Sequence, residues 1–286
     1  TAASAGTIIT VSSSPASING LSPNTNYVAY VRDSCGPGDV SDWVGPINFR
    51  TRCSPVSAPY TENFDGSTFS PGSFFALGSI DPCWQRDTLF DFIWDVESGN
   101  NFTTTTGPDA DHTSGSGQFL FTELTFGGVT ASLSTELSSV PVDLSPLNVP
   151  ELTFWYHLYG SAVDSLEVWV DDGQSRTRVL SLDGQKQNSE SDPWIEAIVS
   201  LSAYANDTVS IIFRGIRNSG FSRAEIAIDD FTIQETPTCP KPQNFTNTAT
   251  TNNSVTLSWT SGGASNWQIE YGSPGFSVGS GTLVTA

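Results

Sequence analysis

The sequence of 286 residues contains no methionine, only two histidines and only 11 lysines and arginines. It has no apolar run that approaches the ~20 residues of a membrane-spanning helix. Thirty acidic residues give it a formal net charge of −19. Because nucleic-acid binding needs cations that neutralise phosphates, this balance argues against a nucleic-acid partner. The lack of a long apolar run argues against membrane insertion of this segment.

The excess of acidic residues has two interpretations. An acidic surface keeps an exposed protein soluble, which is the simpler one. Acidic side chains also attract cations, and calcium takes carboxylate oxygens as ligands. Both interpretations remain open from composition alone.

Amphipathic helices are also missing, and short alternating runs stand in their place. Seventeen Phe, eight Trp and seven Tyr supply enough bulk for a core. Gly, Pro, Asn and Asp punctuate runs in which apolar and polar residues alternate, a pattern typical of strands in a sandwich or jelly roll. The clearest runs are 27–31, 152–156, 166–170, 209–213, 226–233, 255–259 and 267–271. The predicted fold class is all-β.

Four cysteines are present, at Cys35, Cys53, Cys83 and Cys239, with no C-x-x-C pair and no His-rich surroundings. An even number of cysteines in such a β protein favours disulfides over a zinc site, and with them an extracellular protein. Four cysteines allow three pairings, which only geometry can decide.

Two junctions that combine cysteine with proline divide the chain. They lie at 51–55 and 236–240, and proline interrupts β pairing there. The predicted parts are an N-terminal segment (1–52), a middle domain (53–236) and a C-terminal segment (237–286). Each terminal segment is too short for an independent sandwich of about 100 residues.

The two terminal segments complement each other. The C-terminal segment has strand signals near Phe245, at 255–259 and at 267–271, and the N-terminal segment adds 8–11, 16–18, 27–32 and 47–50. Seven strands over about 100 residues form an immunoglobulin-like sandwich. The motif at 21–27, LSPNTNY, with Trp259 and the strand ending at 49–51, resembles a fibronectin type III module. Its C-terminal part therefore corresponds to 1–52, and the N-terminal part of the next module to 237–286. The chain then represents either one period of a tandem array, which we favour, or a piece bounded by two different modules.

The middle domain carries a second set of motifs in order. These are 62–65 (ENFD), 83–84 (CW), 91–94 (DFIW), 107–113 (GPDADHT), 152–160 (LTFWYHLYG), Trp194 and 226–230 (IAIDD). They resemble the MAM domain, a jelly roll found in meprins, neuropilins and receptor tyrosine phosphatases. The combination with fibronectin-like halves resembles large surface adhesins of Bacteroidota.

The resemblance also bears on the cysteines. The family often has a cysteine just before the L-x-F-W-Y segment, where this chain has Glu151. One disulfide of the family is therefore missing, and Cys53 with Cys83 is the preferred remaining pair. Cys35 and Cys239 are expected to pair with neighbouring repeats.

A structural calcium ion is the cofactor that the acids and the resemblance together suggest. Asp109 and Asp111 lie in a Gly/Ser-rich loop, Glu62 and Asp65 near the first strand of the jelly roll, and Asp230 on its last strand. First and last strands often meet in such folds, so these acids are expected to converge. Because Asp229 and Asp230 point to opposite faces of a regular strand, Asp230 is preferred. In the alternative, the acids cap turns without a metal.

Catalysis is not expected. His112 and His157 are the only histidines, and no helix is predicted that would present Ser114 or Ser116 as a nucleophile. Carbohydrate binding by aromatic stacking is a stronger hypothesis. Its candidates are Trp155, Tyr156, Tyr159, Trp169 and Trp194, of which Trp169 and Trp194 are the first to test.

The sequence therefore predicts one repeat period of an extracellular adhesin or surface filament, a structural spacer braced by calcium. Its expected partners are neighbouring repeats, with a polysaccharide or cell-surface glycan and self-association as further hypotheses. The alternative function is a carbohydrate-binding accessory part of a secreted polysaccharide-degrading or proteolytic enzyme.

Overall fold

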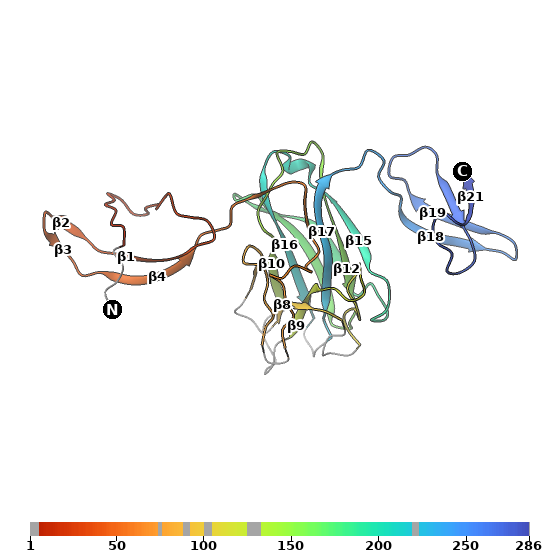
Figure 1. The fold of residues 1–286 in the computed structure, drawn as a ribbon, viewed down its shortest axis with the longest axis horizontal. Helices are drawn as coiled ribbons and strands as arrows, with labels where there is room; N and C mark the ends of the chain where they lie inside the picture. The colour runs from red at the N-terminus through yellow and green to blue at the C-terminus, as the bar shows by residue number, and fades with distance from the viewer. Residues whose placement is uncertain are drawn as a thin grey trace. The chain divides into compact units, whose positions relative to one another are not determined.

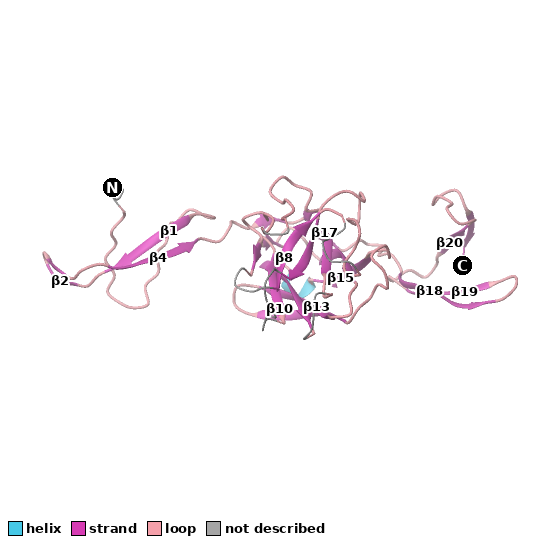
Figure 2. Cartoon of the chain, turned by 90° about the horizontal axis from the view of Figure 1, so that it is seen from below, coloured by secondary structure: helices cyan, strands magenta, loops and turns pink. Residues whose placement is uncertain are grey.

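The structure, a computed structural model, describes residues 6–73, 76–87, 92–99, 105–124, 133–218 and 223–285. Strands dominate these residues, and one short 3-10 turn, η1 (Ser202–Tyr204), is the helical element among them (Figure 2). The predicted all-β fold class is confirmed. The motif residue Asp91 lies outside the described residues.

Two sheets built from residues 56–235 form the sandwich (Figure 1). The first has the order β14-β13-β16-β10-β7, with β11 on β16 and β5 parallel to β11. The second has the order β15-β12-β17-β9-β8, with β6 also on β17.

The strands of the first sheet are β5 (Val56–Ser57), β7 (Gln85–Arg86), β10 (Ser134–Ser138), β11 (Val142–Asp143), β13 (Val163–Asp171), β14 (Arg176–Asp183) and β16 (Thr208–Arg217). Those of the second are β6 (Tyr60–Glu62), β8 (Phe92–Glu97), β9 (Phe119–Leu124), β12 (Pro150–Leu158), β15 (Ile195–Ser200) and β17 (Ile226–Glu235).

The core lies between the two sheets because alternate residues of each strand point inward. Phe213 of β16 is fully buried, with its ring 5.0 Å from that of Phe154 on β12 and 6.1 Å from that of Phe231 on β17. These edge-to-face contacts join the sheets through their aromatic side chains.

The two terminal segments form hairpins that pair only within their own segment in the described part of the chain. In the N-terminal segment β1 (Asn26–Val31) pairs with β4 (Val44–Arg50), and β2 (Ser34–Gly36) with β3 (Asp39–Val40). In the C-terminal segment β18 (Gln243–Thr250) pairs with β19 (Val255–Thr260), and β20 (Gln268–Tyr271) with β21 (Thr282–Thr285).

The strands predicted at 8–11 and 16–18 do not form; both stretches are irregular and exposed. A strand needs a pairing partner and a surface to pack on, and the hairpins of the N-terminal segment supply neither to these residues. The predicted turn at 21–27 does form. The Ser22 N–H donates to the Tyr27 hydroxyl at 2.8 Å, and the Tyr27 ring stacks on Phe49. The assignment to a fibronectin module remains a prediction.

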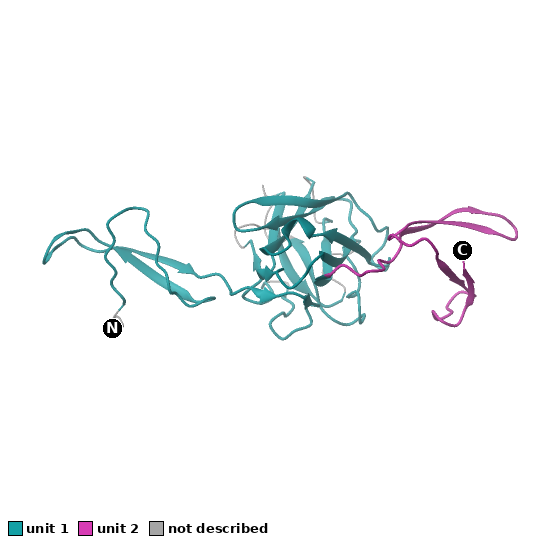
Figure 3. Ribbon diagram, turned by 90° about the horizontal axis from the view of Figure 1, so that it is seen from above, with its two compact units in different colours: residues 1–234 teal, residues 235–286 magenta. Residues whose placement is uncertain are grey.

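The structure divides by contacts into one unit of residues 1–234 and another of residues 235–286 (Figure 3). The boundary between these two units lies within three residues of the predicted start of the C-terminal segment at residue 237. The boundary predicted at residue 52 has no counterpart in this division. The three-part organisation therefore stays a prediction.

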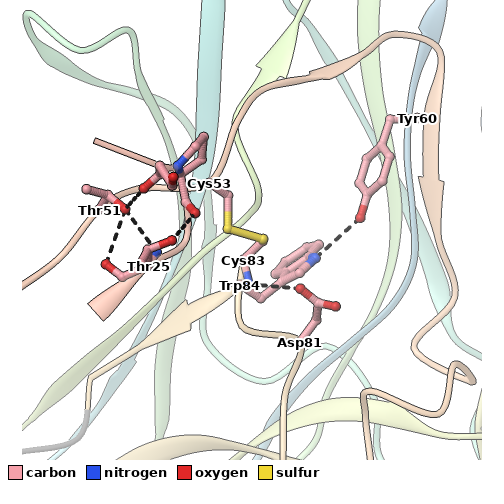
Figure 4. Close-up of a disulfide and its surroundings, with 9 residues drawn as sticks. Thr25, Thr51, Cys53, Tyr60, Asp81, Cys83 and Trp84 are labelled. Carbon is pink, nitrogen blue, oxygen red and sulfur yellow. Dashed lines mark hydrogen bonds between the residues drawn. A yellow bond between two sulfur atoms is a disulfide. The ribbon is translucent and has the colours of Figure 1, made fainter. Parts of the chain in front are cut away.

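Cys53 and Cys83 form the predicted disulfide, with Cα atoms 5.6 Å apart (Figure 4). Cys35 and Cys239 are exposed free thiols. Their expected bonds to neighbouring repeats stay predictions. Among the described residues, no helix is long and apolar enough to cross a membrane.

Candidate cation site

The centre of the candidate site is an irregularity in β17. The inward residues are Ile226 and Ile228 before it, and Phe231 and Ile233 after it. Strict alternation from Ile226 and Ile228 would continue at position 230, which holds an acid; the inward phase instead slips by one residue at Asp229–Asp230. Asp230 has a φ of 48°, in the left-handed region. A β-bulge of this kind re-aims side chains.

The bulge lies where β17 changes partner. Ala227 and Ile228 pair with β9, whereas residues 231–233 pair with β6. The strands β6 and β9 thus lie end to end along the same edge of β17. The loop that follows β6 and the loop that precedes β9 meet beside the bulge, and these loops carry Asp65 and Asp111.

Asp111 and Asp65 both accept hydrogen bonds from the backbone of the loop that precedes β9. Asp111 Oδ1 accepts from the Gly117 N–H at 2.7 Å, and Asp65 Oδ1 accepts from the Gln118 N–H at 2.7 Å. A Cβ placed on Gly117 would lie 2.5 Å from Asp65 Oδ1 and 2.8 Å from Asp111 Oδ2. Gly117 is therefore required for the close approach of these carboxylates.

Asp229 is the most deeply buried of these acids, at 2% exposure. Its Oδ2 accepts from the His112 N–H at 2.9 Å and its Oδ1 from the Asp230 N–H at 2.8 Å. Burial, reinforced by the negative charges of Asp230 and Asp111, raises the pKa of Asp229 to about 8. For Asp111, burial acts in the same direction but the N–H groups of Ser114 and Gly117 outweigh it, so its pKa is lowered.

Asp230 faces the same loop. Its Oδ2 lies 2.6 Å from His112 Nδ1 and also accepts from the Thr113 hydroxyl. The His112 ring stacks on Trp155 of β12, with centroids 3.8 Å apart. The expectation that only one of the two acids can face a cation stays a prediction. The bulge cancels the alternation on which it rested, and both carboxylates contact His112.

Two of the predicted ligands, Glu62 and Asp109, contact other groups. Glu62 Oε1 accepts from the Phe64 N–H, and Oε2 accepts from the Tyr60 hydroxyl at 3.4 Å. Burial, with a smaller contribution from Asp81, raises the pKa of Glu62. Asp109 is exposed, and its backbone N–H donates to the Glu190 carbonyl. The predicted convergence of all five acids is therefore not observed; acidity alone does not fix the direction of a side chain.

No group of three or more His, Cys, Asp or Glu side chains in the described part of the chain is arranged to hold a metal ion. The acids nevertheless suit a hard cation in charge and ligand type. No lysine or arginine of the described residues forms an ion pair with Asp65, Asp111 or Asp229. The remaining ligands of such an ion would be main-chain carbonyls and water.

The two tryptophans predicted to bind sugar differ in their surroundings. Trp194 donates to the Ala110 carbonyl at 3.1 Å, and its ring packs against Phe119 and His157 on the outer face of the second sheet. Trp194 therefore connects the loop at Ala110 to the second sheet and does not present a free ring face to a sugar. Trp169 of β13 is half-buried, donates to Glu167 Oε2 at 3.0 Å and lies under the Arg178 guanidinium.

Curated proteins with similar sequences include MAM domain-containing protein 2 of Mus musculus, 31% identical over 147 residues, which are 50% of this chain and 20% of that protein. Neuropilin-1a of Danio rerio is 30% identical over 165 residues, or 52% of this chain and 17% of that protein. The chain therefore matches about a fifth of the length of these relatives.

Similar solved structures include the K1 cleaved adhesin domain of Lys-gingipain from Porphyromonas gingivalis W83. It is 15% identical with a TM-score of 0.34, over 54% of this chain and 99% of that one. Another is TmCBM61 in complex with β-1,4-galactotriose, 17% identical with a TM-score of 0.35, over 53% of this chain and 88% of that one. Scores this low carry no argument about function.

The model of the MAM domain, meprin/A5/mu, matches residues 75–240, which is more than half of the chain. The matched range contains most of the sandwich strands, from β7 to β17. This chain therefore belongs to the MAM domain family, whose members are adhesion-related extracellular domains.

Proposed function

We propose that this chain is a load-bearing module of an extracellular adhesin, one unit in a series of similar modules. Membership of the MAM family and the Cys53–Cys83 disulfide support an extracellular location. Both histidines have structural surroundings: His112 is held by Asp230 and Trp155, and His157 is fully buried. Mechanical and adhesive roles suit this chain better than catalysis.

The observation that carries the proposal is the connection between the N-terminal segment and the sandwich (Figure 4). The Thr51 hydroxyl donates to the Ser22 carbonyl at 2.6 Å, and the Thr25 N–H donates to the Thr51 hydroxyl at 2.9 Å. The Arg52 carbonyl accepts from the Asn24 N–H, and the next residue, Cys53, is bonded to Cys83. A pull on the N-terminal segment thus reaches the sandwich through a covalent bond as well as through the backbone.

Force spectroscopy on the full chain tests this role. Reducing the disulfide should release the chain between Cys53 and Cys83, a sequence separation of 30 residues, which gives about 100 Å of additional extension at ~3.4 Å per residue. It should also lower the unfolding force of the sandwich. An unchanged extension and force after reduction would show that the disulfide bears no load.

We further propose that a calcium ion braces the junction of β6, β9 and β17. Asp65, Asp111 and Asp229 come from three segments that are distant in the sequence, and a cation would offset their combined charge. Calcium accepts carboxylates, carbonyls and water in flexible geometry, which suits two loops beside a bulge. Its role would be to hold the first and last strands of the sandwich together.

Thermal unfolding of the full chain with EDTA and with excess calcium tests the brace. At a calcium concentration of 100 times Kd, the gain of about 2.7 kcal/mol corresponds to a rise in Tm of roughly 5–10 °C. Asp229→Asn should abolish this rise, because a neutral amide cannot supply the negative charge that a calcium ligand contributes. Asp172→Asn, in an exposed turn, is the matched control and should keep the rise. A calcium-independent Tm in the unaltered protein would refute the brace.

Carbohydrate binding is the second candidate function, favoured by the surroundings of Trp169. Glu167 binds both the Trp169 N–H and Arg178, while Arg176 pairs with Asp171 and Glu136 on the same sheet. An aromatic ring among fixed polar groups is the chemistry that recognises a sugar.

A glycan array probed with the full chain tests this second function, followed by calorimetry on the best ligand. Trp169→Ala should weaken binding at least tenfold. Trp43→Ala is the matched control, because Trp43 also carries an arginine over its ring, Arg32 at 4.4 Å. Equal loss in both variants, or no glycan bound, would exclude a site at Trp169.

A further inference from the structure

The two terminal segments expose the apolar side chains that a sandwich would bury. No described residue in 6–57 or 234–285 is buried. Most large exposed apolar side chains of the described residues belong to these ends; within 58–233 they are Leu77, Leu133, Val149 and Ile195. Contiguous exposed apolar surface marks a site of association.

The C-terminal segment has a groove of about 650 Å³ between its hairpins. We name it the tail groove; Phe245, Trp259, Trp267 and Ile269 contribute its apolar lining. The rings of Trp259 and Trp267 lie 5.5 Å apart, and that of Phe245 lies 6.4 Å from Trp259. Trp267 Nε1 is inaccessible to water and has no hydrogen-bond acceptor among the described residues. The groove therefore offers aromatic surface.

The N-terminal segment has a matching apolar face on the β1–β4 hairpin. Tyr27 pairs with Phe49, and Ala29 with Ile47, so these four side chains share one face, which we name the head face. Ile47 is 67% exposed. A two-stranded hairpin is marginally stable by itself and gains most from a covering layer.

Charge distinguishes these ends from the rest of the chain. The N-terminal segment has three arginines and three aspartates, and the C-terminal segment one lysine and one glutamate. The whole formal net charge of −19 thus lies in the middle domain. Contact through the terminal segments joins surfaces that do not repel each other, whereas contact between middle domains brings like charges together.

We propose that the head face of one copy of this chain docks on the tail groove of a second copy, so that the two segments complete one sandwich. The described terminal segments, 6–52 and 237–285, together contain about 100 residues, the size of a seven-stranded sandwich. A stable interface needs roughly 20–30 residues a side, which each segment can supply. A head-to-tail contact leaves one free head and one free tail, so the assembly grows as a series. The proposal does not depend on the calcium brace.

Sedimentation of the full chain under reducing conditions, over concentrations from ~1 to ~200 μM, tests the proposal. The mass should rise with concentration beyond that of a dimer. Phe245→Asp blocks the tail groove and Ile47→Asp blocks the head face; each variant alone should stay monomeric. An equal mixture should form a dimer and nothing larger, because the intact head of one variant meets the intact tail of the other.

Val278→Asp is the matched control, since Val278 is 93% exposed and does not line the groove; it should associate as the unaltered chain does. A monomer at all concentrations would overturn the proposal. So would a mixture that remains monomeric, or association that one of the two blocking variants leaves intact. Circular dichroism of each variant verifies that the middle domain is folded.

A second readout uses the free thiols. Cys239 borders the tail groove, and Cys35 lies in the N-terminal segment. Oxidised glutathione should convert one Cys35 and one Cys239 thiol into an intermolecular disulfide while it is reduced to two molecules of glutathione. Covalent dimers should vanish in Cys35→Ser and in Cys239→Ser. Dimers that persist in either variant would contradict the head-to-tail arrangement.

Discussion

The middle domain and the terminal segments are both made of strands, yet they differ in what those strands bury. Within 56–235, facing strands enclose a core of fully buried side chains such as Phe154 and Phe213. Within the described part of the terminal segments, hairpins with equally regular pairing bury no residue. The comparison teaches that alternation specifies a strand and its inward face, whereas a core needs a second layer.

The two regions differ in charge as well as in burial. The middle domain encloses its own core and carries the net negative charge of the chain. The terminal segments are almost neutral and expose aromatic and aliphatic side chains. Incomplete burial and low charge therefore coincide in the terminal segments.

The largest expected effect is a core truncation in the middle domain. Phe213→Ala should cost about 3–5 kcal/mol of unfolding free energy, because Phe213 is fully buried between two aromatic rings. Phe245→Ala, at a residue that is 63% exposed, should change the stability of the dilute chain by less than about 0.5 kcal/mol. Urea denaturation measures both. Similar losses would mean that the terminal segments have a core of their own.

The disulfide should give the next largest effect. The double variant Cys53→Ser/Cys83→Ser should lose about 2–4 kcal/mol, because the cross-link restrains a loop of 30 residues in the unfolded chain. The matched double variant Cys35→Ser/Cys239→Ser should leave the middle domain unchanged. If both pairs of substitutions cost the same, the free thiols would also contribute to folding.

His157 should make the middle domain sensitive to acid. Burial lowers the pKa of His157 from 6.5 to about 4. Between these pH values the unfolded chain therefore binds a proton at His157 that the folded chain does not bind. Stability should therefore fall as the pH drops from about 6.5 to about 4, by up to ~3 kcal/mol. His157→Phe should remove this loss, and the difference between the two pH profiles isolates the residue. Parallel profiles would show that His157 becomes protonated in the fold.

Gly117 should give the smallest of the four effects. Gly117→Ala would place a methyl group against Asp65 and Asp111 and should cost about 1–2 kcal/mol, because carboxylate groups can rotate away. Gly36→Ala is the control, because Gly36 also lacks a left-handed φ and its added Cβ would meet no neighbouring atom. Calorimetry with and without calcium measures both. A larger calcium response in Gly117→Ala than in the unaltered chain would contradict the proposed ligands.

Much of the fold could be predicted from the sequence, because alternation and turn residues are local signals. The strands at 152–156, 166–170 and 209–213 all appear, each extended by a few residues, as β12, β13 and β16. The stretches at 8–11 and 16–18 alternate equally well but form no strand. A strand depends on a partner, and the local pattern does not reveal whether one is present.

The candidate site was predictable only in part. Asp65 and Asp111 were identified by residue type, but Glu62 and Asp109 turn to other partners. The preference for Asp230 over Asp229 assumed strict alternation, which the bulge interrupts. One signal was nevertheless present in the sequence: the apolar residues of IAIDDFTI fall at 226, 228, 231 and 233, so their spacing changes at the two aspartates.

That change of spacing means that β17 carries one residue more than its core requires. If Asp230 were deleted, Ile226, Ile228, Phe231 and Ile233 would alternate without interruption, and all four could still point inward. The strand would become more regular, while the loop with His112 would lose one of its two carboxylate partners. A single-residue deletion here therefore separates two properties that substitutions leave mixed: the packing of the last strand, and the anchoring of the loop beside it.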